Sequence, residues 1–452
     1  MAVTVRFVER ALPDLPVPAE VPTLPPSVFE ARAARLEEAR QRAGLDCLAI
    51  YADREHSANL AWRCGFDPRF EETLWIEAAA PRPTLLVGNE NLGYAPAQLR
   101  VPAEVVLYQP FSLPNQDRSR SADLEGLLRR AGVRASMRIG LVGWKPQERS
   151  EVPYWIVRAF ADLTGREPAN ATTLLMDPDQ GLRTVLEPEM IRFCEYASSL
   201  TSTALRDWVF SLREGLSERE AAAALRSYGL ELSCHPMVNF GRPIPSGLKS
   251  PRNSRVVRGE YAQAAFGLIG ALTCRAGRLI GREDADRVDD EDGYSDLVEN
   301  YLQVVRAWFA SVRIGATGGE VVAAADGARS AAWDPAVNQG HLIHLDEWVS
   351  SPFYAGSRAT LKSGYAIQQD IIPVPRHGAA ALNMEDGFVL ADNDLQTQLQ
   401  RADPPMMTRC LARGEWMESL GYEIAPEVLP LSNIAGAFFP FLLDPRYVAA
   451  FA

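Results

Sequence analysis

The chain has 452 residues, of which 47% are hydrophobic, and a formal net charge of −12 at pH 7. This length allows a large buried core and predicts two or three domains. The acidic balance argues against a nucleic-acid partner, because binding to phosphate groups needs a basic surface. We therefore expect a globular protein with a small-molecule ligand.

No sequence pattern directs the chain to a membrane or out of the cell. The longest apolar stretch, residues 261–277, is shorter than the about 20 apolar residues that span a bilayer. The first residues lack the continuous apolar region of a secretory signal. Six scattered cysteines without a CxxC pair predict reduced, mostly buried thiols. We expect a soluble, cytoplasmic protein without a membrane partner.

The N-terminal half begins with a proline-rich arm, residues 1–27, which is expected to be extended and to lie on another subunit or on the body of the protein. A helix is predicted next, because apolar residues recur at three- and four-residue spacing from Phe29 to Ala39 and Gly44 follows. Residues 28–182 are predicted to form one α/β domain. Its further predicted elements are four apolar strands, at 47–52, 83–89, 104–109 and 138–144. A helix is predicted at 121–132, before the last of these strands.

The C-terminal half, residues 183–452, is predicted to contain two pairs of helices. The first helix should start at Pro188, and the second at Ser217, which has a glutamate three residues on as in a capping box. Ser295 and Thr317 mark the second pair in the same way. The buried face of the first helix would carry Ile191, Cys194, Leu205 and Trp208.

Strand-like segments separate these helix pairs, which predicts an internally duplicated α+β domain. The acidic run 282–292 is expected to be a solvated loop.

Several segments carry a resemblance to a known family. They are, in chain order, GLDCLAIYADREHSANLAWRCGFDP, LEPEMIRFCEYASSLTSTAL, LREGLSEREAAAAL, SGLKSPRNSRVVRGEY, NQGHLIHLDEW, KSGYAIQQDIIP and ALNMEDGFVLAD. Together they resemble the superfamily of creatinase, aminopeptidase P and prolidase over nearly the whole chain after the arm. The resemblance implies a creatinase-type N-terminal domain, a pita-bread domain with a pseudo-twofold duplication, and a homodimer. It also implies that the N-terminal domain, in the segment around His56, contacts the partner's active site.

The resemblance also bears on metal binding. Metallopeptidases of this superfamily hold two divalent ions with two aspartates on a strand hairpin, one histidine and two further acids. Here the aspartate positions fall on Ala265 and Ala276, and the three remaining positions on His341, Asp370 and Glu385. Neighbouring registers of the hairpin offer Ala264, Gln263, Cys274 or Arg275, none of which is a carboxylate. We predict no metal and no cofactor, because three groups are too few for a two-metal centre; a single retained ion is the alternative.

Four residues are predicted from the segments around the site. Creatinase-like enzymes use a histidine as general acid and base where this chain has Lys249, which acts as a base if desolvation lowers its pKa and is otherwise a surface lysine. The alternation of GHLIHLDEW predicts a strand that points His341 into the site and leaves His344 packed or at the rim of a substrate site. Trp348 takes the place of a second histidine of the peptidases, and its indole can stack on a planar or cationic ligand.

The acidic side chains are expected to determine ligand binding. Asp370, Glu385 and His341 would form a metal-free charged cluster that binds an ammonium or guanidinium group and orients a water. Arg275 and His377 are further candidates for substrate binding. Alternatively, the two acids are structural and pair with Arg275, Arg278 or Arg376, and His377 is structural as well.

Two classes of function follow from these patterns. The first is a metal-independent, creatinase-like hydrolase that cleaves a carbon–nitrogen bond of a small polar or cationic compound, with His341 or Lys249 as proton carrier. The second is a ligand-binding or scaffold protein that has lost catalysis. An Xaa-Pro aminopeptidase-like metallopeptidase with a reduced metal site is a further alternative.

Overall fold

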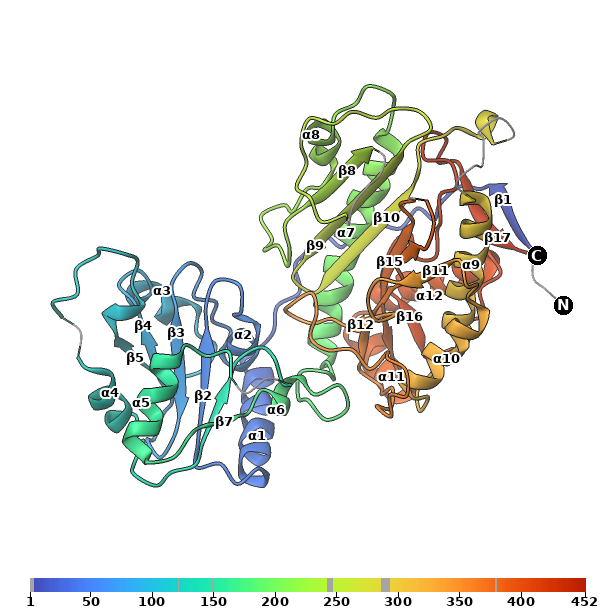
Figure 1. Ribbon diagram of the computed structural model, residues 1–452. Coiled ribbons are helices and arrows are strands. Elements are labelled where there is room, and N and C mark those ends of the chain that lie inside the picture. The colour runs from blue at the N-terminus through green and yellow to red at the C-terminus, as the bar shows by residue number, and fades with distance from the viewer. Residues whose placement is uncertain (1–3, 121, 148–149, 242–246, 286–292, 379) are drawn as a thin grey trace. The chain divides into compact units, whose positions relative to one another are not determined.

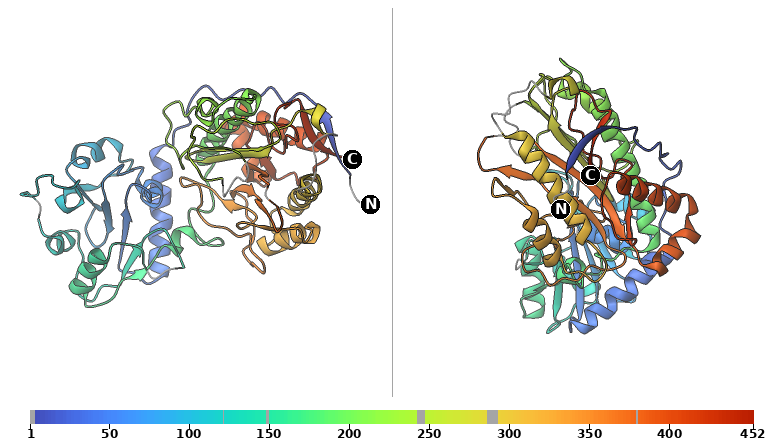
Figure 2. Two further views of the ribbon diagram at one scale, coloured as in Figure 1. Left: turned by 45° about the horizontal axis from the view of Figure 1, so that its top comes forward. Right: turned by 90° about the vertical axis from the view of Figure 1, so that its right-hand side faces the viewer.

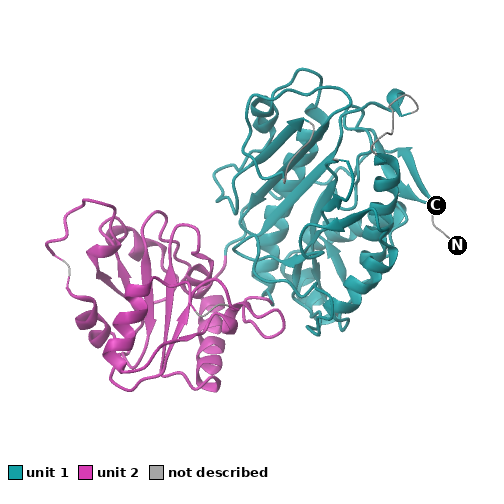
Figure 3. Ribbon diagram, in the orientation of Figure 1, with its two compact units in different colours: residues 1–23, 185–452 teal, residues 24–184 magenta. Residues whose placement is uncertain are grey.

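The computed structural model describes residues 4–120, 122–147, 150–241, 247–285, 293–378 and 380–452. It divides into two compact units (Figure 3). The smaller unit comprises residues 24–184, and the larger unit comprises residues 1–23 and 185–452. Within the described ranges, no helix is long and apolar enough to cross a membrane.

The smaller unit is an α/β structure around one sheet with the strand order β5-β4-β3-β2-β6-β7 (Figure 1). Its strands are β2 (Cys47–Ala52), β3 (Thr73–Glu77), β4 (Thr84–Val87), β5 (Glu104–Leu107), β6 (Ile139–Val142) and β7 (Ala169–Asn170). Its helices are α1 (Pro26–Arg42), α2 (Ala58–Cys64), α3 (Asn91–Gln98), η1 (Gln109–Phe111), α4 (Leu124–Arg130), α5 (Tyr154–Thr164) and α6 (Thr173–Met176).

The four predicted strands of this unit are confirmed as β2, β4, β5 and β6. The side chains of each apolar run are fully or partly buried. Strand β2 lies within the sheet, parallel to β6 and antiparallel to β3, and all six of its side chains are buried. Strand β3, which was not predicted, lies between β2 and β4. The predicted first helix is confirmed as α1, with its terminus just before Gly44.

The larger unit is built on a seven-stranded sheet with the order β12-β13-β15-β10-β9-β8, in which β16 also pairs with β15. Its helices are α7 (Pro188–Ser211), α8 (Glu218–Ala221), η2 (Ala222–Ala224), η3 (Arg282–Asp284), α9 (Tyr294–Ser311), α10 (Gly318–Ala328), α11 (Asn393–Ala402) and α12 (Pro404–Ser419). Its strands are β1 (Val5–Glu9), β8 (Met237–Gly241), β9 (Tyr261–Leu268), β10 (Ala271–Arg278), β11 (Trp333–Pro335), β12 (His341–Leu342), β13 (Ala366–Asp370), β14 (Pro373–Pro375), β15 (Asn383–Leu390), β16 (Val428–Pro430) and β17 (Tyr447–Phe451).

Helices α7 and α9 cover one face of this sheet (Figure 1). The Thr201 hydroxyl of α7 is hydrogen-bonded to the Thr273 hydroxyl of β10 at 2.9 Å, and Trp308 of α9 contacts Phe388 of β15 edge to face. Since side chains alternate along a strand, the neighbours of Thr273 and Phe388 point to the opposite face. That opposite face carries the polar residues described below.

The two helix pairs repeat each other at an offset of 100 residues, from the α7–α8 segment to the α9–α10 segment. Helices α7 and α9 end at Ser211 and Ser311, and each of these hydroxyls donates to the carbonyl oxygen three residues earlier at 2.8 Å. Ser217 and Thr317 then form the predicted capping boxes with Glu220 and Glu320. The repeat supports the predicted internal duplication.

Three local predictions for this unit were wrong. The second helix ends early, because α8 gives way to the single turn η2 after the capping box. Helix α9 begins one residue before Ser295, with Gly293 as its N-cap in a left-handed conformation at φ 63°. The strand predicted over 340–348 ends at Leu342. The predicted acidic loop lies partly outside the described residues, which end at residue 285 and resume at 293.

Residues 4–23 of the proline-rich arm belong to the larger unit, whereas the predicted end of the arm at residue 27 lies in the smaller unit, where α1 begins at Pro26. Strand β1, which was not predicted, pairs antiparallel with β17 at the other end of the chain (Figures 1 and 2). Further along the arm, the Leu15 carbonyl oxygen accepts a hydrogen bond from Asn433 Nδ2 at 3.3 Å. The arm therefore lies on the body of its own chain.

Candidate functional site

Polar side chains from three neighbouring strands meet on the open face of the seven-stranded sheet. Asp370 of β13 is paired directly with Glu385 of β15, and Glu385 with Cys274 of β10, so all three point to one face. His341 of β12 is paired with Gln368, two residues before Asp370, and therefore points the same way. The sheet register thus assembles the three residues that the resemblance singled out.

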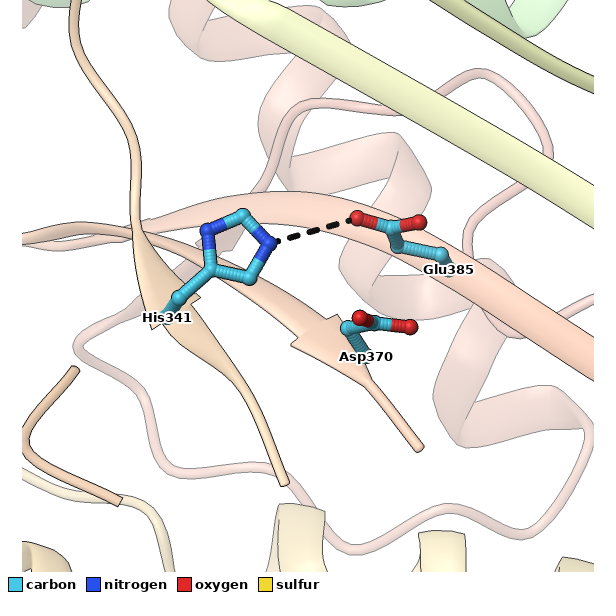
Figure 4. A group of neighbouring side chains, drawn as sticks. All are labelled: His341, Asp370 and Glu385. Carbon is cyan, nitrogen blue, oxygen red and sulfur yellow. Dashed lines mark ion pairs between the residues drawn. The ribbon is translucent and has the colours of Figure 1, made fainter. Parts of the chain in front are cut away.

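His341, Asp370 and Glu385 form a compact buried cluster (Figure 4). One ligand atom from each lies within 4.8 Å of the others. His341 Nε2 is 3.5 Å from Glu385 Oε1 and 3.3 Å from Oε1 of Glu347. The imidazole is stacked on the indole of Trp348, with ring centroids 4.3 Å apart and planes 16° apart. This stacking and the two carboxylates fix the ring.

Two neighbours of the buried cluster, Glu347 and Trp348, are partly exposed. His341 is fully buried, whereas the Glu347 side chain is 29% exposed and Trp348 is 37% exposed. Glu347 was not predicted, and alternation could not have placed it, because the chain leaves the sheet after Leu342. The structure therefore adds a third carboxylate to the predicted pair.

The acidic groups of the cluster retain protons more strongly than ordinary carboxyl groups. Burial, followed by the charges of Glu347 and Asp386, raises the pKa of Glu385 well above its usual value. Burial and the charge of Glu385 raise the pKa of Asp370 in the same direction, against the opposing effect of His341. Carboxyl groups in this state can donate a proton near neutral pH.

Several buried polar atoms on this face have no hydrogen-bond partner among the described residues. Gln368 lies beside His341, and Asn383 lies two residues before Glu385 on the same strand. Asn239 completes the row, because its amide nitrogen donates to the Lys249 carbonyl oxygen at 2.7 Å and leaves its oxygen without a donor. The unpartnered atoms are Gln368 Oε1, Asn383 Oδ1, Asn239 Oδ1, His341 Nε2 and Glu385 Oε1. An acceptor-rich buried surface of this kind calls for a donor from a ligand or from water.

The charges of the cluster contribute to raising the pKa of two thiols. Burial, and then the charges of Glu347 and Glu385, raise the pKa of Cys234 to about 12. Burial, and then Glu385 and Asp370, raise the pKa of Cys274 well above its ordinary value. All six cysteines are free, as predicted, and five are fully buried. These thiols are protonated and therefore weak nucleophiles.

The segment matching GLKSP lies over the same face. Gly247 has a φ of +67°, and a Cβ atom there would come within 2.1 Å of the Gln263 side chain. The Leu248 carbonyl oxygen is 2.7 Å from Nε2 of His235, a histidine that the sequence analysis did not assign. Lys249 itself is exposed. The desolvation on which its role as a base depends is absent, so that prediction was wrong.

The hairpin of β9 and β10 carries no carboxylate toward the cluster. Ala265 is paired with Cys274, and Ala276 with Gln263, and these four positions lie on the cluster's face. The residues present fit a single divalent ion bound by His341, Asp370 and Glu385, because these offer one nitrogen and two oxygen ligands. They do not fit the second ion of a two-metal centre.

Arg275 does not reach the cluster, and its predicted role in substrate binding was wrong. It lies on the opposite face of the sheet, where Nη2 contacts both oxygens of Asp386 at 2.9 and 2.8 Å. The alternative that Arg275, Arg278 or Arg376 neutralises the cluster was wrong too. Arg278 donates to a backbone carbonyl oxygen and Arg376 pairs with Asp334.

The other two predicted binding residues do not adjoin the cluster's open side. His344 is fully buried beyond the end of β12, so the predicted alternation does not decide its direction. His377 is exposed after β14.

Comparisons with known proteins identify the fold. No protein-family model matches the sequence, and no curated protein does. Among solved structures, the prolidase from Pyrococcus horikoshii OT3 is 15% identical with a TM-score of 0.62, over 80% of this chain and 95% of that chain. Dipeptidase PepE from Mycobacterium ulcerans is 19% identical with a TM-score of 0.62, over 82% and 95%. The chain has the pita-bread fold of these solved peptidase structures.

The pita-bread fold also occurs in a protein that is described as part of an assembly. The N-terminal domain of FACT complex subunit SPT16 from chickpea (Cicer arietinum) is 12% identical with a TM-score of 0.59, over 82% of this chain and 96% of that chain. The fold therefore does not decide the activity, which depends on the residues of the cluster.

Proposed function

We propose that this chain is a hydrolase that cleaves a carbon–nitrogen bond of a small polar or cationic compound without a metal ion. His341 is the proton carrier, and Asp370 and Glu385 bind the cationic part of the substrate. The observation that carries the proposal is one buried imidazole with two buried carboxylates and the partly exposed Glu347 around it, with no arginine or lysine of the described residues pairing with these acids.

The electrostatics of the cluster favour a positively charged ligand. Asp370 and Glu385 repel each other and are buried, so their charged forms are destabilised in the unliganded chain. A guanidinium, amidinium or ammonium group would relieve this repulsion and donate to the unpartnered oxygens of Gln368 and Asn383. These groups therefore select a ligand that is both cationic and rich in N–H donors.

The position of His341 suits it to acid and base catalysis. Its Nε2 lies 3.3 Å from Glu347 Oε1 and 3.5 Å from Glu385 Oε1, and the indole of Trp348 is stacked on its ring. In the proposed reaction Nε2 takes a proton from water as the water oxygen attacks the substrate carbon. The carbon–nitrogen bond then breaks, and His341 returns the proton to the leaving nitrogen.

A metallopeptidase with a single ion is a second candidate function. It is favoured by the spacing of His341, Asp370 and Glu385, which would hold the ion and place it beside Glu347. A bound ion would supply a Lewis acid and an activated water. We rank it second because the hairpin positions that complete the metal centre are Ala265 and Ala276.

The proposal is tested with a thermal-shift screen of small guanidines, amidines and amides, followed by detection of the released amine for each compound that binds. We expect His341→Ala to lower kcat/KM about 10²- to 10⁴-fold while the chain stays folded, because general acid–base catalysis contributes about that much. His377→Ala, at the exposed histidine, is the matched control and should keep full activity. Full activity in His341→Ala would refute the assignment, and binding without any product would favour a non-catalytic binding protein.

A further inference from the structure

A cavity lined by acidic and aromatic residues lies within the smaller unit. Its volume is about 360 Å³, which is within the range of small-molecule sites. Its walls come from the turn after β2, the segment before β3, and the segment after η1. The residues that matter below are Asp53, His56, Phe70, Glu72 and Phe111.

One wall of the cavity is an oriented Asp–His pair. Oδ1 of Asp53 accepts hydrogen bonds from the backbone N–H groups of Glu55 and His56, both at 2.9 Å. The same oxygen is 3.0 Å from His56 Nδ1. The His56 ring is stacked on Trp144, with centroids 3.7 Å apart and planes 12° apart. Oδ1 therefore has three neighbours, and Oδ2 has no hydrogen-bond donor among the described residues.

The other charges that line the cavity are mostly satisfied. Arg54 pairs with Glu55 at 3.4 Å, and both are about three-quarters exposed. Glu71 accepts two backbone N–H groups at the start of α3, at 3.1 and 3.0 Å. Glu72 is half-buried and has no ion pair with a described residue. Asp53 pairs with His56 through Oδ1, whereas Glu72 is an acid of the cavity that has no ion pair with a described residue.

The carboxylates of Asp53 and Glu72 line the cavity together with two apolar rings. Burial, and to a smaller extent the charges of Asp53 and Glu71, raise the pKa of Glu72. Phe70 is 57% exposed although it is a large apolar side chain, and Phe111 is buried at the wall. A cation with an apolar body would neutralise the carboxylates and cover the exposed ring of Phe70.

We propose that this cavity is a second ligand site, for an organic ammonium compound. The ammonium group binds between Asp53 and Glu72, and the apolar body of the ligand lies against Phe70 and Phe111. The aromatic wall distinguishes this site from one for a hydrated metal ion. All residues that line the site belong to the smaller unit, so this proposal does not depend on the proposed hydrolase.

The test is isothermal titration of the full chain with 2-phenylethylamine, which is protonated at neutral pH, and with the neutral analogue 2-phenylethanol. Glu72→Gln keeps the shape of the side chain and removes its charge. Glu38→Gln, at a 69% exposed position on α1, is the matched control. Glu385→Gln reports any binding to the cluster of the larger unit.

We expect the amine to bind to the wild-type chain and to bind about tenfold more weakly to Glu72→Gln, which is the loss of one charge-assisted contact. Glu38→Gln should leave the affinity unchanged, and 2-phenylethanol should not bind. The proposal is overturned if the wild-type chain does not bind the amine or if Glu72→Gln retains full affinity. It is also overturned if Glu385→Gln abolishes binding or if the alcohol binds equally well.

Discussion

Two adjacent acids of β15 should respond in opposite ways to the loss of their charge. Glu385 faces the cluster, where burial and neighbouring acids raise its pKa and Oε1 accepts no hydrogen bond. Asp386 faces the other side of the sheet and pairs with the buried guanidinium of Arg275. We therefore predict that Glu385→Gln stabilises the larger unit and that Asp386→Asn destabilises it.

The magnitudes follow from the partners of each group. Glu385→Gln keeps a polar group at this position but removes the cost of a buried charge beside other acids. Each unit by which folding raises a pKa corresponds to about 1.4 kcal/mol, so the gain should be on the order of 1–3 kcal/mol near neutral pH. At about 2–4 °C per kcal/mol, the melting temperature should rise by roughly 2–10 °C. Removing one member of a buried ion pair costs about 3–5 kcal/mol, so Asp386→Asn should lower the melting temperature by a larger amount.

The pH dependence of the two variants separates this explanation from a general packing effect. Because the pKa of Glu385 is raised on folding, the native chain binds more protons than the unfolded chain above about pH 4.3, and its stability falls as the pH rises. Glu385→Gln has no carboxyl group to titrate at this position, so its stability does not fall for this reason. The difference in melting temperature between this variant and the wild-type chain should therefore be small near about pH 4.5 and should grow toward about pH 8. Differential scanning calorimetry at both pH values measures it. A lower melting temperature of Glu385→Gln at the higher pH would refute the reasoning, because it would mean that a bound cation stabilises the carboxylate.

Two further predictions concern the repeat and the thiols. Ser217→Ala and Thr317→Ala should each lower the free energy of unfolding by about 1 kcal/mol, because they remove equivalent capping boxes. Urea denaturation measures both changes, and a loss of stability in only one variant would contradict the equivalence. At about pH 8 the native thiols should react slowly with an aromatic disulfide reagent, and Cys234, which is not fully buried, should react before Cys274. Rapid labelling of Cys274, detected by peptide mass spectrometry, would show that the cluster is more open than described.

The sequence was sufficient to predict elements whose evidence is local. The helix from Pro188 carries its four predicted apolar residues on a buried face, and both capping boxes form as predicted. Apolar runs such as residues 47–52 are strands because a fully buried strand needs no alternation. The cluster of His341, Asp370 and Glu385 was also identified, through the resemblance of three short segments to a known family.

Features that depend on distant parts of the chain were not predictable. Strand β1 forms only because β17, at the other end of the sequence, offers it an edge. Arg275 belongs to Asp386 rather than to the cluster because of sheet register, which periodicity alone does not give. The alternation in GHLIHLDEW suggested a strand, but the chain leaves the sheet after Leu342, which allows Trp348 to turn onto His341.

The metal content of the purified, untagged chain tests the central proposal most directly. Elemental mass spectrometry is applied before and after incubation with manganese, zinc and cobalt, followed by exhaustive dialysis. A metal-independent centre predicts well below one ion per chain under every condition. About one tightly bound ion per chain that disappears in His341→Ala would contradict this account and favour the single-ion metallopeptidase.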